Sequence, residues 1–402
     1  MADKKYQAEY RYKIKLQYLN TANNTATDIK NECLKSLIID HNYDVNCMPV
    51  LFANVKLDKA LVDDMIKNMD SNLLIMNITK YDNTTDFKLE ALCFREKFIY
   101  FFPDDVNKMD PADYNDETNA TMKGDTYREL TIGLLCLKHV NNNKIKCELT
   151  AKKITMYNIV KYLTSHINNM VIEPFTYNEI FEQFNLKPQD SVNKALEYLN
   201  NYRVFYSSPY RYYQDFSFAY ILSSSGRATE RKDELYSSVV IQIRDIDEDD
   251  ANNTGVITNK STGTYELYVN YANTQVYDNT IMNKSRNKVL GITTSGSSSA
   301  TLKNNASYST TKIRSVRLNN DNIHMLDNMK YKDNTENFLV YFSKNDLDTE
   351  LLTLNKRISI RNIDRYQEFN GEYLLYRKRE IYLREDESFV LNSMINLKRI
   401  DK

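Results

Sequence analysis

Residues 196–226 read LEYLNNYRVFYSSPYRYYQDFSFAYILSSSG, and this stretch joins the two halves of the chain. It completes a helical pattern, passes through seven tyrosines and one proline, and ends in an apolar strand followed by a Ser/Gly turn. It contains no histidine or cysteine, and its carboxylates are Glu197 and Asp215. General acid–base catalysis needs positioned titratable groups, so we interpret the stretch as an architectural joint.

The composition limits the possible function classes. The chain has 402 residues, which is enough for two to three domains of about 100–200 residues each. Its 53 Lys and Arg residues balance 54 Asp and Glu residues, giving a formal net charge of −1. Proteins that grip nucleic acid need clustered positive charge, so this balance excludes a basic clamp but allows DNA to pass without being held.

The distribution of residue types favours β structure, above all in the second half. Tyrosine reaches 31 residues, tryptophan is absent, and all six prolines lie at or before Pro209. Because a proline removes a hydrogen bond from a strand ladder, the half without proline can form uninterrupted strands.

The cysteines and the apolar segments indicate where the chain assembles. The five cysteines form no C-x-x-C pair, which argues against a disulfide framework or a zinc site and for a reducing compartment. The N-terminus lacks the apolar core of a signal peptide. Since no segment approaches the roughly 20 consecutive apolar residues of a membrane span, we expect no membrane-spanning segment.

Hydrophobic periodicity predicts a β-rich first part. Residues 10–18 alternate apolar and polar side chains, the pattern of a strand with one face in water. Further strands are predicted before a helix that Asp58 caps, and again before an acidic loop over residues 104–125. Residues 127–137 and 143–151 predict a hairpin with its turn near His139.

A change of period then predicts helices. Residues 155–170 show a spacing of three and four, Thr176 with Glu179 resembles a capping box, and Asp190 or Ser191 can cap a third helix. Short strands resume from Val204. We therefore predict a mainly β protein with a short helical insert (α+β), as a barrel-like β domain at 1–152, an insert at 153–203 and a β barrel or sandwich at 204–402.

Two groups of residues are candidate sites of chemistry. Residues 245–250, DIDEDD, have the alternating carboxylates of an EF-hand loop, but Asp250 stands where glycine is needed and Val256 where glutamate is needed. Cys47 lies near His41 without a third orienting group. We expect no catalytic residue, no metal site and no cofactor.

Two segments resemble the baseplate or tail hub proteins of contractile-tailed bacteriophages that infect Gram-positive bacteria. They are residues 37–58, LIIDHNYDVNCMPVLFANVKLD, and residues 195–227, ALEYLNNYRVFYSSPYRYYQDFSFAYILSSSGR. In such proteins a strand, a loop ending in Met-Pro, and a following strand and helix precede a stretch rich in tyrosine and arginine. Both segments occur here in that order.

The resemblance implies a non-enzymatic structural protein of the virion. Three chains, each with two barrel-like domains, would form a ring in the tail baseplate that joins the hexameric tail tube to the trimeric central spike and lets DNA pass. The implied partners are two further copies, the tail tube protein, the central spike protein, baseplate wedge proteins and, passively, the genome DNA during ejection. Assembly would take place in the host cytoplasm.

Other functions stay open at this point. The chain could be a receptor-binding tail adhesin, another baseplate protein such as a wedge component, or a hydrolase that uses residues 245–250 or Cys47 with His41. We predict that the tyrosines of the joint pack between a sheet and a neighbouring subunit. The candidate interface residues are Arg203, Tyr206, Tyr210, Arg211, Tyr212 and Tyr213.

Overall fold

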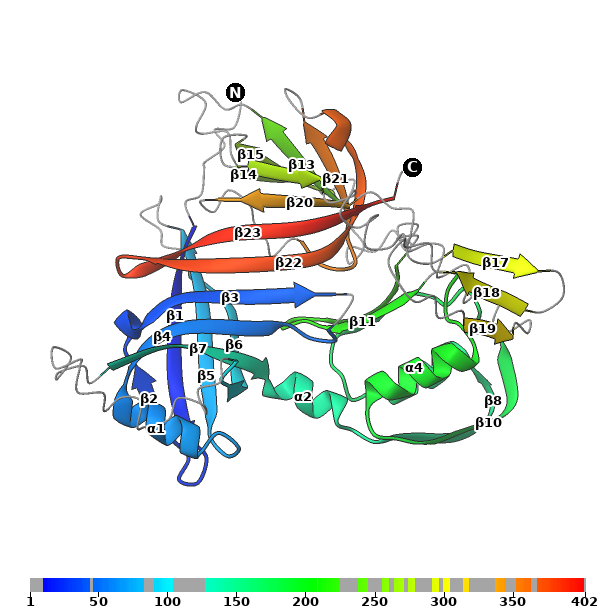
Figure 1. Ribbon diagram of the computed structural model, residues 1–402, viewed down its shortest axis with the longest axis horizontal. Helices are drawn as coiled ribbons and strands as arrows, with labels where there is room; N and C mark the ends of the chain where they lie inside the picture. Colours follow the sequence, from blue (N-terminus) through cyan, green and yellow to red (C-terminus); the bar gives the residue numbers. More distant parts are fainter. Residues whose placement is uncertain are drawn as a thin grey trace.

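In the computed structural model, a closed β-barrel, an open sheet and a small α/β unit lie side by side (Figure 1). The structure describes residues 10–43, 46–82, 90–103, 127–207, 209–224, 238–244, 255–259, 264–270, 274–278, 291–295, 299–303, 314–317, 337–343, 352–362 and 367–400.

Eight antiparallel strands close the barrel. They follow the order β22, β3, β4, β7, β6, β5, β1, β23, and β23 pairs back to β22. Between β1 and β23 the closure rests on the pair Tyr12 and Phe389. The strands are β1 (Tyr10–Asn20), β3 (Leu34–Asn42), β4 (Val50–Asp58), β5 (Leu73–Asp82), β6 (Glu90–Phe101), β7 (Tyr127–Cys136), β22 (Gly371–Glu385) and β23 (Ser388–Arg399). Along part of its length β1 pairs with β2 (Thr25–Ile29) instead of β23.

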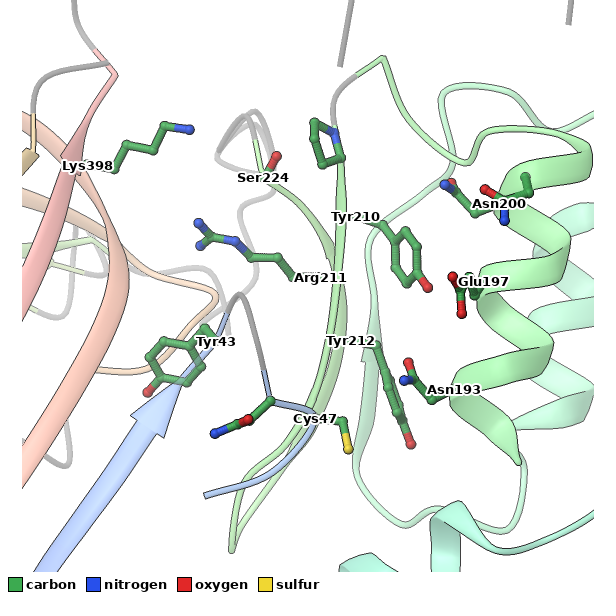
Figure 2. A pocket seen from close by; sticks show the side chains of 13 residues that line it. Tyr43, Cys47, Asn193, Glu197, Asn200, Tyr210, Arg211, Tyr212, Ser224 and Lys398 are labelled. Carbon is green, nitrogen blue, oxygen red and sulfur yellow. The ribbon is translucent and has the colours of Figure 1, made fainter. Parts of the chain in front are cut away.

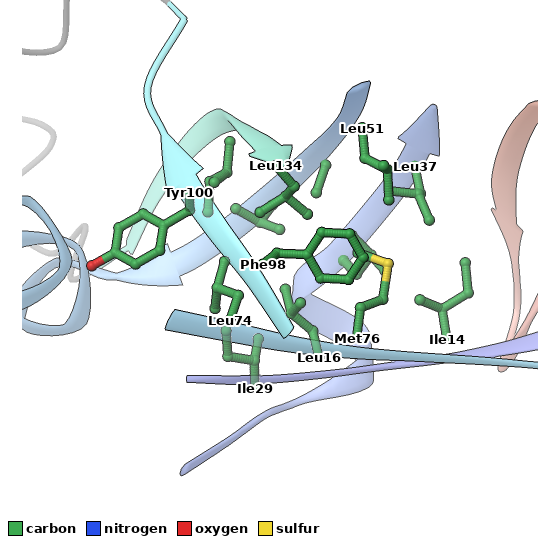
Figure 3. Close-up of a cluster of buried hydrophobic side chains, with 14 of the residues drawn as sticks. Ile14, Leu16, Ile29, Leu37, Leu51, Leu74, Met76, Phe98, Tyr100 and Leu134 are labelled. Carbon is green, nitrogen blue, oxygen red and sulfur yellow. The ribbon is translucent and has the colours of Figure 1, made fainter. Parts of the chain in front are cut away.

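Alternating side chains fill the barrel interior. Figure 3 shows Leu16, Leu37, Leu74 and Phe98 converging from four strands, and all four are buried. Helix α1 (Lys59–Lys67) contributes its own buried residues to this core, and the Tyr100 hydroxyl donates a hydrogen bond of 2.8 Å to a carbonyl of the helix. The predicted cap is confirmed, because the Asp58 side chain accepts from the second residue of the helix at 2.8 Å.

The hairpin of β22 and β23 extends beyond the barrel into the open sheet. At a bulge between Leu375 and Arg377, the neighbour of β22 changes from β21 to β3. The far half of β23 pairs with β20, so this one hairpin belongs to both β units. The other strands of the open sheet are β13 (Val239–Arg244), β14 (Gly255–Asn259), β15 (Thr264–Asn270), β16 (Thr274–Asp278), β20 (Asn337–Phe342) and β21 (Arg357–Asn362).

The small unit carries three helices, a two-stranded ribbon and a three-stranded sheet around a core of its own. The ribbon pairs β8 with β10, and the sheet has the order β11, β12, β9. Its elements are α2 (Leu137–Asn143), β8 (Cys147–Thr155), α3 (Met156–Leu163), β9 (Met170–Ile172), β10 (Ile180–Gln189), α4 (Val192–Tyr202), β11 (Tyr210–Gln214) and β12 (Ala219–Ser223). Elsewhere, β2 (Thr25–Ile29) pairs with β1, and β17 (Gly291–Ser295), β18 (Ser299–Lys303) and β19 (Arg314–Arg317) form a separate sheet.

Two predicted elements are wrong. The hairpin expected around His139 does not form: β7 pairs with β4 and β6, and α2 lies where the turn was expected. The helix expected after Thr176 is the strand β10. Phe184 and Leu186 are buried at a spacing of two beneath the helices, and pairing with β8 satisfies the backbone, so tertiary context overrides the local capping signal.

The mainly β fold with a helical part is confirmed. The predicted boundaries at residues 152 and 203 stay a prediction. Strands from both sides of these boundaries pair in one barrel, because β22 and β23 complete the barrel whose other strands lie within the first 136 residues. The acidic loop at 104–125 lies outside the described residues, and of residues 283–311 the structure describes only β17 and β18.

Candidate functional site

The tyrosine-rich joint forms a small sheet between two hydrophobic cores. In β11, Tyr213 belongs to the core of the open sheet, whereas Tyr212 belongs to the core of the small unit. In β12, Tyr220 and Ile221 divide in the same way. Successive side chains of a strand point to opposite faces, so a strand covered on both faces needs large apolar groups at every position. This accounts for the run of aromatic residues that marks the stretch.

Four of the six predicted interface residues are buried inside the chain. Tyr206, Arg211, Tyr212 and Tyr213 are each at most 5% exposed. The Tyr206 hydroxyl contacts the carbonyls of Glu173 and Ile221 at 2.9 and 3.2 Å. These four side chains therefore stabilise the chain's own fold and offer almost no surface to a neighbour.

Buried polar side chains of the joint form hydrogen bonds with the neighbouring β strands. Arg211 donates from Nη1 to the carbonyl of Leu375 on β22 at 2.9 Å. The Tyr213 hydroxyl lies 3.1 Å from His41 Nδ1 on β3. These hydrogen bonds connect the small sheet to the barrel strand and to the shared hairpin.

The other two predicted interface residues keep exposed surface. The Arg203 side chain is 38% exposed, with Nε 3.6 Å from a carboxylate oxygen of Glu179 and its guanidinium 5.6 Å from the ring centre of Tyr202. Tyr210 is half-buried, and burial raises the pKa of its hydroxyl. A subunit contact at the joint stays a prediction, centred on these two residues.

A buried charged cluster lies beside the joint. Lys378 Nζ is 3.1 Å from Glu380 Oε1, and His41 lies 3.9 Å from both Glu380 and Asp215. Burial raises the pKa of the Glu380 carboxyl, but Lys378 and His41 together hold it well below its usual value. Burial lowers the pKa of Lys378, yet the charges of Glu380 and Asp215 raise it above its usual value. The lysine and the glutamate are therefore a charged pair inside the fold.

A pocket of about 480 Å³ opens beside β11 (Figure 2). Tyr210 and Tyr212 point toward α4, where Asn193, Glu197 and Asn200 lie, and Arg211 points the other way, toward Lys398 on β23. One wall therefore offers amide groups and a carboxylate, and the other carries positive charge. The remaining lining residues are Tyr43, Asn46, Cys47, Asn201, Pro209 and Ser224.

The described residues give no support to a catalytic site. The Cys47 thiol accepts a hydrogen bond of 3.4 Å from the Asn143 side chain, and burial raises the pKa of this thiol, which disfavours the reactive thiolate. Burial lowers the pKa of His139 to about 4. Among the described residues no three His, Cys, Asp or Glu side chains gather as metal ligands, and DIDEDD, at residues 245–250, lies outside them. In the described part of the chain, no helix is long and apolar enough to cross a membrane.

Comparison with solved structures shows low identity over nearly the whole chain. The tail protein of Neisseria meningitidis MC58 is 9% identical, with 96% of each chain covered and a TM-score of 0.47. The 43 kDa tail protein of prophage MuSo2 from Shewanella oneidensis is 9% identical, with 98% of each chain covered and a TM-score of 0.42. The lidded Francisella PdpA–VgrG complex is 11% identical at a TM-score of 0.46, and the chain spans 54% of that longer protein.

No curated protein sequence matches the chain. A family model does match, and it covers residues 4–400. The expectation of a bacteriophage protein is confirmed at this level: the chain belongs to the bacteriophage PBS1 gene 109 protein family.

Proposed function

We propose that the chain is a structural protein of the phage tail, the central baseplate hub. Three copies form a ring that joins the hexameric tail tube to the trimeric central spike and leaves a passage for DNA. The proposal rests on membership of a bacteriophage protein family together with the resemblance of residues 37–58 and 195–227 to tail hub proteins. The tail tube, spike and wedge proteins are its proposed partners.

The observation that carries the proposal is the hairpin shared by the two β units. Because β22 and β23 pair within the barrel and within the open sheet, each chain presents two β units in a fixed relation. Three chains then place six β units around a ring, which suits a sixfold tube on one side and a threefold spike on the other.

Charge and cysteine chemistry support the same role. A net charge of −1 gives DNA no strong hold on the ring as it passes. All five cysteines are free, as suits assembly in the reducing host cytoplasm before the virion is released.

We place one subunit contact at the exposed part of the joint. Arg203 lies beside Tyr202, and Tyr202 and Tyr198 are exposed on the outer face of α4. Arginine and tyrosine are enriched in protein interfaces, where a ring contact of this permanent kind buries about 2,000 Å² or more.

The test is the mass and symmetry of the purified protein, alone and with its spike and tube proteins from the same phage. We expect particles of three 47.2 kDa chains, and a threefold ring in electron micrographs. The double variant Tyr202→Ala/Arg203→Ala weakens the ring, whereas Lys67→Ala, at an exposed position of α1 outside the joint, does not. A chain that stays monomeric with both partners present contradicts the hub. Binding to host cells that depends on Tyr210 favours the adhesin instead.

A further inference from the structure

A second pocket, of about 480 Å³, lies against the barrel between β6 and α2. It is formed where α2 continues directly from the end of β7 (Figure 1). The structure describes all of its lining residues, and three of them carry positive charge. This pocket, called the α2 pocket below, is lined by Ile75, Arg95, Glu96, Lys97, Leu137, Lys138 and Asn141.

Strand alternation places two cations of β6 on the outer face of the barrel. Arg95 and Lys97 are both exposed, and Lys97 lies opposite Ile75 of β5. Glu96, between them in sequence, lies opposite the buried Met76 and therefore points to the inner face of the strand. The carboxylate among the lining residues thus points away from the two cations.

The cations of the α2 pocket differ from others on the barrel surface in their surroundings. Lys13, on β1, has its Nζ 2.8 Å from a carboxylate oxygen of Glu90. In the part of the chain that the structure describes, the exposed side chains of Arg95, Lys97 and Lys138 form no ion pair. Like charges around one pocket repel one another, and a bound anion relieves that repulsion.

Helix α2 is held from its other side, which fixes one wall of the pocket. His139 is buried, with its ring centre 5.8 Å from that of Phe216. The Asn142 side chain donates a hydrogen bond of 2.9 Å to Oε1 of Gln214. Lys138 is exposed and lines the pocket. Because these contacts orient the helix without a ligand, little ordering of the wall is needed on binding.

The lining residues define the chemistry of the ligand. Ile75 and Leu137 are half-buried and give the pocket an apolar part, and the cations surround it. An aliphatic side chain with carboxylates beside it matches both features. The lining offers no aromatic ring on which a base could stack, and a net charge of −1 gives nucleic acid no broad attraction. The ligand chemistry is therefore that of an acidic protein segment.

We propose that the α2 pocket binds an acidic segment of a partner protein. An aliphatic side chain of the segment packs on Ile75 and Leu137, and the carboxylates beside it pair with Arg95, Lys97 and Lys138. This inference goes beyond the proposed hub and does not depend on it, because every lining residue belongs to one chain.

The test measures binding of the peptide acetyl-Asp-Glu-Leu-Glu-Asp-amide to the full chain. We expect a Kd below about 1 mM at low ionic strength, and weaker binding as salt is added. The neutral peptide acetyl-Asn-Gln-Leu-Gln-Asn-amide has nearly the same shape and is expected to bind about tenfold or more weakly. Replacing the Leu of the acidic peptide by Gly removes the apolar contact and weakens binding about threefold or more.

A charge exchange locates the site. Arg95→Glu/Lys97→Glu is expected to bind the acidic peptide about tenfold or more weakly and to gain affinity for acetyl-Lys-Lys-Leu-Lys-Lys-amide. A variant that merely fails to fold does not gain this second affinity. Lys35→Glu makes the same kind of charge change at an exposed position of β3, and it leaves both affinities within about twofold.

Several outcomes overturn the proposal. These are no binding of the acidic peptide at about 1 mM, equal binding of the acidic and neutral peptides, or a charge-exchanged variant that gains no affinity for the lysine peptide. If a DNA duplex of about 20 base pairs binds more tightly than the acidic peptide and Arg95→Glu/Lys97→Glu abolishes this, the ligand is nucleic acid and the acidic segment is wrong. If the same variant abolishes self-association of the chain in sedimentation, the occupant is a second copy and not a partner protein.

Discussion

At the scale of single residues, the charged pair inside the fold has large consequences. Lys378 and Glu380 lie on the same strand two residues apart, so both side chains point to one face of β22, where His41 of β3 also lies. Burial of either charge alone would carry a large desolvation penalty, and the opposite charge of its partner offsets that penalty. The sequence offers no sign of this, because in KREIYLRE these residues look like an ordinary solvated strand face.

Removal of one partner is expected to destabilise the fold strongly. Glu380→Gln leaves the Lys378 ammonium without its nearest carboxylate, and we expect a loss of about 3–5 kcal/mol in the free energy of unfolding. Urea unfolding followed by circular dichroism measures this. The double variant Lys378→Met/Glu380→Leu removes both charges and is expected to be more stable than Glu380→Gln. A double variant that is less stable than the single contradicts the charged-pair account.

The same pair gives the stability a defined pH dependence. The folded pKa of Glu380 lies below its ordinary value of 4.5, so its stabilising contribution is full above pH 4.5 and is lost as the pH falls toward the folded pKa. The folded pKa of Lys378 lies above 10.5, so its contribution is lost only as the pH rises beyond that value. We expect the acid limb of a stability–pH curve below pH 4.5 to be shallower in Glu380→Gln. An unchanged slope contradicts this.

At the scale of elements, periodicity predicted most strands and failed where distant partners decide. The alternation in β1 and the cap of α1 were readable because they depend on neighbours in sequence. The capping signal at Thr176 predicts a helix where strand β10 forms, because the partner strand β8 and the helices that pack on Phe184 and Leu186 leave no signal in the local sequence. The tyrosines of β11 were recognised as packing residues, but alternation alone does not distinguish the chain's own second core from a neighbouring subunit.

One element depends on a glycine opposite an aromatic ring. Gly133 on β7 pairs with Phe101 on β6, and a Cβ added at Gly133 would collide with the Phe101 ring. Gly133→Ala forces the ring to move, and we expect a loss of about 1–3 kcal/mol in urea unfolding. Phe101→Leu shortens the opposing side chain, so adding it to Gly133→Ala is expected to cost less than the two single losses together. If the stability loss of the double variant equals the sum of the two single losses, the added Cβ does not collide with the Phe101 ring.

At the scale of the whole molecule, the barrel is completed by strands far away in sequence. β1 and β5 lie within the first 82 residues, whereas β22 and β23 begin at Gly371 and Ser388. Pairing between strands so far apart in the chain leaves no signal in the local sequence. For this reason the sequence predicted consecutive domains and not a hairpin shared by two β units. The same hairpin connects the barrel and the open sheet through continuous strand pairing, which suits the proposed hub role.

A shared hairpin predicts that the two β units unfold together. On β23, Leu391 belongs to the barrel core and Ile395 to the core of the open sheet. Leu391→Ala and Ile395→Ala each leave a cavity in a core and are expected to lower the free energy of unfolding by about 2–5 kcal/mol. We expect both variants to lower the midpoint temperature of one and the same unfolding transition. Calorimetry checks this through the ratio of the calorimetric to the van't Hoff enthalpy, which is near one for a single unit. The same calorimetric measurement on Leu196→Ala, a cavity variant in the core of the small unit, serves as the comparison for the two variants of β23. Two separate transitions, with Leu391→Ala lowering one and Ile395→Ala the other, would show that the hairpin does not couple the units and would remove the main structural support for the hub.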